Sequence, residues 1–91
     1  PSDLSQLALA TMWLVQDAPE QAAAVLASLN ENNTRYEAEY EFLLGEYNWH
    51  INDIDEAREQ WQETIDRDYT PPWIFEAVQQ RLEDTEPETQ P

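Results

Sequence analysis

The chain has no cysteine and no lysine, and it contains one glycine and one histidine among 91 residues. Without cysteine, disulfides, thiolate nucleophiles and cysteine-based metal sites are excluded, and the redox compartment stays undetermined. A single glycine excludes the glycine-rich loops that cradle phosphates. No apolar run approaches the roughly 18 residues that a membrane span needs. We therefore expect no direct insertion into a membrane.

Acidic residues dominate the charge, because 20 Asp and Glu stand against four Arg and give a formal net charge of −16 at pH 7. Nucleic acid is excluded as a partner, since binding to its phosphates depends on Lys and Arg that displace counterions. An anionic membrane surface is disfavoured for the same reason. A basic protein segment would be attracted by electrostatic steering. An excess of acidic residues more often forms only a solvated acidic exterior than a site that binds a basic partner.

One pattern of apolar and small residues occurs twice, first in residues 9–29 and again 35 positions later in residues 44–64. The matching pairs are Leu9 with Leu44, Ala10 with Gly45, Ala22 with Ala57, and Leu26 with Trp61. A repeat of this length indicates stacked helical hairpins, each of which buries its apolar face against a neighbour. Such arrays present an extended surface, which favours a binding role over catalysis.

Apolar residues recur at helical spacing in five segments, and no segment alternates as a strand does. We expect helices at about 3–16, 19–29, 35–50, 54–67 and 73–83, with a turn at 30–34 and a disordered acidic tail at 84–91. Asp17 is expected to cap the second helix, and Asn52 or Asp53 the fourth, because Glu20 follows Asp17 at the capping-box position and Glu56 follows Asp53 in the same way. Arg58 is expected to face water. Since the chain begins with proline rather than methionine, we expect a piece of a longer polypeptide.

The second copy of the pattern resembles the tetratricopeptide repeat, in which a Leu-Gly pair, aromatic residues, a small alanine and a closing proline recur. The matching residues are Leu44, Gly45, Glu46, Tyr47, Ala57, Trp61 and Pro71. The resemblance implies an all-α fold of antiparallel hairpins stacked as a right-handed superhelical array, an α-solenoid fragment. Residues 1–83 would hold one repeat at about 4–30, a second at about 35–69 and a capping helix at about 73–83. Asn48, Thr64 and Tyr69 depart from the family pattern.

In that family the first helix of each hairpin lines a concave face where extended peptides or partner helices dock. The partner-binding residues that the resemblance implies here are Leu7, Thr11, Leu14, Glu39, Phe42, Glu46, Trp49, His50, Trp73, Glu76, Gln80 and Glu83. Trp49 and Trp73 are expected to dominate the binding energy, with core packing as the alternative for each. Glu39, Glu46 and Glu76 would select a basic segment, with solvated surface carboxylates as the alternative.

The sequence contains no arrangement of residues that predicts catalysis or metal binding. Glu46 and His50 lie one helical turn apart, but the second histidine of a zinc-binding helix motif is missing. Asp53, Asp55 and Glu56 lack the glycine and the later bidentate glutamate of a calcium loop, and a helix cap explains them better. We therefore expect neither an enzyme nor a bound cofactor or metal.

Two hypotheses about function stay open. The first is an interaction module that binds a peptide or helix of a partner protein, within a larger scaffold, chaperone or assembly factor. Residues 43–47 with Asn52 and Asp53 are also similar to repeats of bacterial envelope assembly factors, which favours the periplasm. The cytoplasm stays open as an alternative, and the sequence does not determine the location. The second is a structural or self-associating segment without a ligand of its own. Accessible Trp49 and Trp73 would favour the first hypothesis, and burial of both the second.

Overall fold

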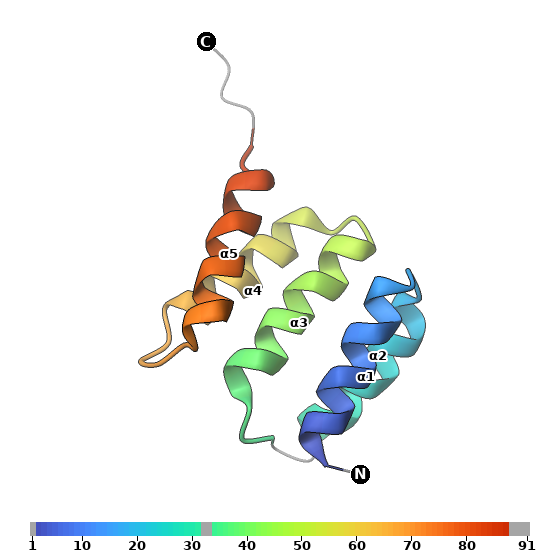
Figure 1. The fold of residues 1–91 in the computed structure, drawn as a ribbon. Coiled ribbons are helices and arrows are strands. Elements are labelled where there is room, and N and C mark those ends of the chain that lie inside the picture. Colours follow the sequence, from blue (N-terminus) through green and yellow to red (C-terminus); the bar gives the residue numbers. More distant parts are fainter. Residues whose placement is uncertain (1, 32–33, 88–91) are drawn as a thin grey trace.

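Five helices make up the regular structure of the protein (Figure 1). The computed structural model describes residues 2–31 and 34–87. In chain order the helices are α1 (Asp3–Val15), α2 (Pro19–Glu31), α3 (Glu37–His50), α4 (Ile54–Ile65) and α5 (Pro72–Asp84). These ranges contain no strand, and none of their helices is both long enough and apolar enough to cross a membrane. The all-α class predicted from the apolar periodicity is confirmed.

The helix boundaries differ from the expected ones by up to two residues. The turn expected at 30–34 begins too early, because α2 continues through Glu31. α3 begins at Glu37 rather than Arg35, and α4 ends at Ile65 rather than Arg67. α5 takes in Asp84, the first residue of the expected tail. Residues 32–33 of the turn and 88–91 of the tail lie outside the described residues.

The helices form two layers, with α1, α3 and α5 in one and α2 and α4 behind them (Figure 1). α3 is the centre of the fold, because it packs against each of the other four helices. α1 and α5 both flank α3, but no contact joins them within the described ranges. The front layer is therefore open between α1 and α5, above α3.

The 35-residue offset is visible in the packing of the two hairpins. Ala10 and Gly45 are buried where the first helix of each hairpin meets the second. The equivalent pairs on the second helices, Ala22 with Ala57 and Leu26 with Trp61, are at most 1% exposed. Small side chains let the helices approach closely, and at Gly45 a Cβ atom would overlap the Trp61 ring. The sequence repeat thus corresponds to a repeat in structure.

The two hairpin turns also repeat, and they correct the role expected for Asp17. Asp17 and Asn52, which are 35 positions apart, both take left-handed backbone conformations, with φ of 57° and 66°. Asn and Asp tolerate this region better than other residues with a Cβ atom, and it commonly ends a helix. Asp17 therefore ends α1 rather than capping α2. Asp53 does cap α4, because its Oδ1 accepts a hydrogen bond from the Glu56 N–H at 3.3 Å.

Arg58 does not face water as expected, but closes the far end of α5. Its Nη1 donates to the Leu82 carbonyl at 2.7 Å and to Thr85 Oγ1 at 2.9 Å. A helix ends with carbonyls that lack a partner inside the helix, and a cationic donor is well suited to them. This contact between α4 and the last turn of α5 helps to position α5 against the second hairpin.

Candidate functional site: a groove between α1 and α5

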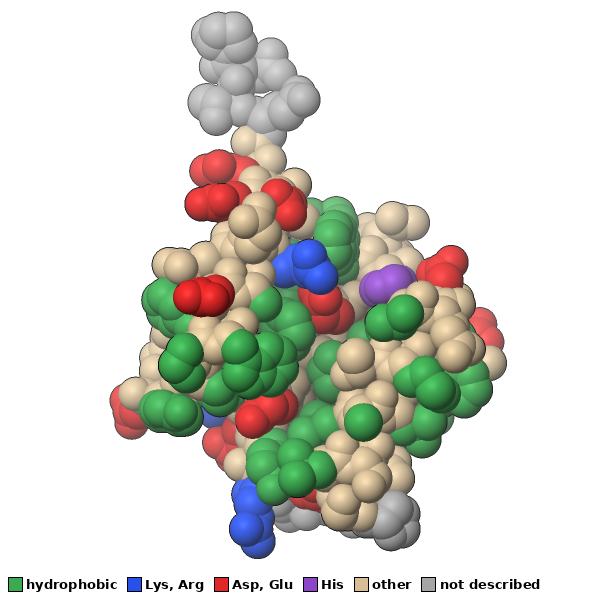
Figure 2. Space-filling view, in the orientation of Figure 1, with side chains coloured by type: hydrophobic (Ala, Val, Ile, Leu, Met, Phe, Trp, Pro, Cys, Tyr) green, Lys and Arg blue, Asp and Glu red, His purple; other side chains and the backbone are tan. Residues whose placement is uncertain are grey.

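The opening in the front layer is a groove of about 540 Å³, a volume in the range of small-ligand sites. α1 and α5 form its walls, and α3 forms its floor. Figure 2 shows hydrophobic side chains over α1 and over α5, on either side of a hollow between them. The lining residues are Leu4, Leu7, Ala8, Thr11, Leu14, Val15, Glu39, Phe42, Leu43, Glu46, His50, Trp73 and Arg81. Most of this lining is apolar.

α1 supplies a wall because its residues at three- and four-residue spacing fall on one face. Leu4, Ala8, Thr11 and Val15 are exposed along this face. Leu7 and other residues on the inner side of α1 are buried in the core. The exposed leucine and valine of this row adjoin the other apolar residues of the groove lining and form one apolar surface with them, so the wall of the groove is a candidate contact surface.

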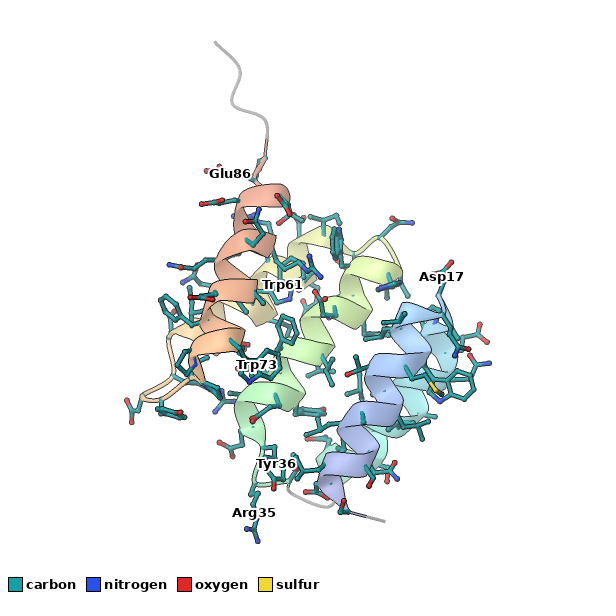
Figure 3. The ribbon with its side chains drawn as sticks, in the orientation of Figure 1. Asp17, Arg35, Tyr36, Trp61, Trp73 and Glu86 are labelled. Atoms are coloured by element: carbon teal, nitrogen blue, oxygen red, sulfur yellow. The ribbon has the colours of Figure 1, made fainter. Side chains whose placement is uncertain are left out.

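The second wall carries Trp73, which is 59% exposed. Its ring lies edge-to-face against Phe42 on the floor, with centroids 6.1 Å apart and planes at 84°. Figure 3 shows Trp73 between α5 and α3. This contact holds a large aromatic surface at the groove without burying it, in an arrangement that aromatic pairs favour.

An ion pair ties α5 to the floor of the groove. Arg81 Nε and Nη2 each donate to one carboxylate oxygen of Glu46, both at 2.9 Å. The Glu46 side chain is only 13% exposed, and its hydrogen bond raises the pKa of the Arg81 guanidinium. The guanidinium also lies 4.7 Å from the centroid of the Trp49 ring, a cation–π distance. Because Glu46 is largely buried and its charge is balanced by Arg81, this carboxylate has little net charge to offer a cation of a partner.

Thr11, Glu46 and Arg81 are separated by 35 residues each, and all three line the groove. They occupy equivalent positions on α1, α3 and α5. At this one position the offset extends from the two hairpins to α5. It does not hold along the whole helix, because Trp73 corresponds to Ala38, which does not line the groove. Applied to α5 it selects Arg81 as a lining residue, whereas the residues expected there, Glu76 and Gln80, correspond to positions on the far side of the helix.

His50 lies at the groove near the first hairpin turn. Its Nδ1 is 3.4 Å from Asp17 Oδ1, so the end of α3 meets the turn between α1 and α2. The Asp17 side chain is 84% exposed, which makes this a weak pair in water. The contact contributes little to holding the two hairpins together.

The structure brings most of the expected partner-binding residues to one surface. Those that line the groove are Leu7, Thr11, Leu14, Glu39, Phe42, Glu46, His50 and Trp73. Those outside its lining are Trp49, Glu76, Gln80 and Glu83. Trp49 is partly buried and packs edge-to-face on Trp61 at 5.8 Å, so it supports the core rather than the groove surface. Trp73 remains accessible.

Sequence reasoning missed several residues of the groove. These are Leu4, Ala8, Val15, Leu43 and Arg81. Four of them sit one helical turn from, or next to, an expected lining residue, so the helical spacing was a usable signal. Arg81 was signalled by its offset of 35 from Glu46.

The charges of the groove are mostly paired. Arg81 neutralises Glu46, whereas Glu39 has no ion pair within the described ranges. A second hollow of about 600 Å³ adjoins the start of α3 and is lined largely by charged residues, among them Glu37 and Arg67, which pair at 3.0 Å. Its polar character makes it a poorer candidate for a site that takes apolar groups. In the described part of the chain, no cluster of three or more His, Cys, Asp or Glu is placed to hold a metal ion.

Comparison of the chain with family models, with curated proteins and with solved structures finds no match in any of the three.

Proposed function

We propose that the protein is a tetratricopeptide-like interaction module that binds a peptide or helix of a partner protein in the groove between α1 and α5. The observation that carries the proposal is the groove itself, with its apolar lining, its volume of about 540 Å³ and the exposed Trp73 on one wall. A water-exposed apolar surface of this kind is typical of an interaction site. An aromatic anchor at such a site often dominates binding.

The arrangement of the helices supports this proposal. The first helices of the two hairpins and α5 lie in one layer (Figure 1). Each contributes one residue of the groove at a spacing of 35, namely Thr11, Glu46 and Arg81. In a right-handed superhelical array, that layer would form the concave face. The ion pair of Arg81 with Glu46 and the contacts of Arg58 with α5 hold the second wall in place before a partner arrives. A preformed groove lowers the entropy lost on binding.

A substitution at Ala8 tests the proposal, because Ala8 is exposed, lines the groove and leaves the core untouched. Ala8→Arg would fill part of the groove. Ala27→Arg, on the exposed side of α2, changes the net charge equally and is the matched control. The parent and both variants are used to select binders from a phage-displayed library of random peptides, after circular dichroism shows that all three are folded.

Peptides that bind the parent and Ala27→Arg but not Ala8→Arg would support the groove as the binding site. Peptides that bind all three proteins equally would contradict it. Failure to enrich any peptide, together with concentration-dependent self-association of the parent in sedimentation, would favour a structural or self-associating segment instead.

A further inference from the structure

We propose that one end of the groove binds an arginine side chain of the partner peptide, at a corner formed by Leu4, Glu39 and Trp73. We call these three residues the cation corner. All three line the groove, with Leu4 on α1, Glu39 on α3 and Trp73 at the start of α5. The inference rests on the proposed peptide-binding function and adds to it the chemistry of the partner.

Glu39 is the acidic group that remains available in the groove. Arg81 holds both oxygens of Glu46, and Arg67 pairs with Glu37 and Glu41 at 3.0 and 2.8 Å. Glu39 is partly buried and has no ion pair in the described ranges. A carboxylate that is partly shielded from water interacts more strongly with a cation than a fully exposed one does.

Arg35 is the cation that could compete for Glu39, because it lies four residues earlier and both line the polar hollow beside the start of α3. It precedes α3 rather than belonging to it, and it is exposed. The structure gives no ion pair between Arg35 and Glu39 among its described contacts. On its groove side, Glu39 is therefore open to a cation from outside the chain.

Trp73 supplies the second contact with the arginine, through the face of its ring. Phe42, one helical turn after Glu39 on α3, packs against the Trp73 ring and so brings the ring to the same end of the groove as the carboxylate. Tryptophan is the aromatic side chain that attracts cations most strongly over its face. A guanidinium can stack on such a ring and donate to a carboxylate at the same time, which a lysine ammonium does less well.

The rest of the groove determines which kind of side chain in the peptide is favoured next to the arginine. Leu7, Leu14 and Leu43 are buried or nearly so beneath the open space, and they favour an apolar neighbour. The net charge of −16 attracts a cationic peptide from a distance but does not locate it. Both this field and the cation corner favour arginine over a neutral side chain of the same shape, but only the contribution of the corner depends on Glu39.

The test uses two capped tripeptides, N-acetyl-leucyl-arginyl-leucinamide and the same peptide with citrulline in place of arginine. Citrulline has nearly the shape of arginine but no charge. Each is titrated into the ¹⁵N-labelled protein at low ionic strength. The readouts are the indole N–H signal of Trp73, assigned through its loss in Trp73→Phe, and the backbone amides of Phe42 and Leu43. Glu39→Gln tests the carboxylate, and Glu76→Gln, on the exposed side of α5, is the control of equal charge.

We expect the arginine peptide to shift the Trp73 indole signal with a dissociation constant about tenfold lower than that of the citrulline peptide, from one ion pair and one cation–π contact. Glu39→Gln should remove most of this difference, and Glu76→Gln should keep it. Equal losses in the two variants would show that the overall field, and not the cation corner, attracts the peptide, and would overturn the inference.

The outcomes separate this inference from the proposed function. If both peptides shift the groove signals equally, the groove binds peptides without selecting arginine, so the inference fails and the proposed function stands. If neither shifts them, the inference also fails, and the selection with Ala8→Arg and Ala27→Arg decides whether the groove binds peptides at all.

Discussion

A methyl group added at Gly45 is expected to destabilise the protein, although alanine is the better helix former. Gly45 lies within α3, and its φ is not positive, so its backbone conformation does not require glycine. A Cβ atom there would overlap Nε1 and Cδ1 of Trp61. The Trp61 side chain is fully buried, and its Nε1 has no hydrogen-bond partner among the described residues. Lack of space, rather than conformation, explains the glycine.

Two opposing effects set the magnitude. Helix propensity favours alanine over glycine by about 1 kcal/mol. Overpacking a filled core costs about 1–3 kcal/mol, and occasionally more. The cost should be high here, because Trp49 packs on the Trp61 ring at 5.8 Å and limits its movement. We therefore expect Gly45→Ala to lower the free energy of unfolding by about 1–2 kcal/mol, which corresponds to roughly 4–8 °C in Tm for each kcal/mol.

The assay is urea unfolding followed by circular dichroism, for Gly45→Ala, Trp61→Leu and the double variant. Because leucine leaves room for the new methyl group, Gly45→Ala should cost at least about 1 kcal/mol less in the Trp61→Leu background. Ala24→Gly, on the exposed side of α2, calibrates the helix propensity. A Gly45→Ala protein as stable as the parent, or an equal cost in both backgrounds, would refute close packing of Trp61 on Gly45.

Three further changes test the contacts around the groove. Arg58→Met removes the donor to the end of α5, so we expect a loss of about 1–2 kcal/mol in urea unfolding and faster amide exchange in the last turn of α5. Arg81→Lys keeps the charge but loses the bidentate pair with Glu46, which should lower stability by about 0.5–1.5 kcal/mol in thermal unfolding. A hydrogen bond to Glu41 raises the pKa of Glu63 in the folded protein. Folding therefore disfavours the charged form of Glu63, so Glu63→Gln should raise the urea midpoint at neutral pH, and this gain should vanish once the pH falls below the unfolded-state pKa.

Matched controls keep these three results interpretable. Arg35 is exposed, so Arg35→Met and Arg35→Lys should change stability little. Glu86→Gln removes one negative charge beyond α5 and controls for the net charge of −16. Unchanged amide exchange in Arg58→Met would contradict its capping role, and equal melting of Arg81→Lys and the parent would show that the bidentate geometry adds nothing. A gain in Glu63→Gln that persists at low pH would mean that its cause is not the charge of Glu63.

The helices were predictable because each one carries its own local signal. Apolar spacing located all five, and the Glu that follows Asp53 made Asp53 one of two candidates, with Asn52, for the cap of α4 that the structure assigns to Asp53. The end of α1 was misread, because Asp17 has the sequence context of a cap but adopts a left-handed conformation. Comparison with Asn52, its counterpart 35 residues later, carried the correct signal. Local pattern alone does not separate the last residue of one helix from the cap of the next.

The groove was predictable in outline, because the floor and one wall follow from helical spacing on α1 and α3. The α5 wall was assigned to the wrong side of the helix at Glu76, Gln80 and Glu83, which the groove lining does not include. The described residues after α5, 85–87, hold no helix whose apolar spacing would help to orient α5 from sequence. Contacts between residues far apart in the chain were not predictable from local pattern. Among them are the Arg81 pair with Glu46 and the packing of Arg58 against α5.

Mapping of amide chemical shifts with a peptide selected on the parent protein is the decisive test of peptide binding in the groove. We expect saturable shifts in residues that line the groove on α1, α3 and α5, with the Trp73 indole among the largest and with the response lost in Ala8→Arg. Shifts confined to the outer faces of α2 and α4 would contradict the claim, because those faces lie on the opposite side of the fold (Figure 1).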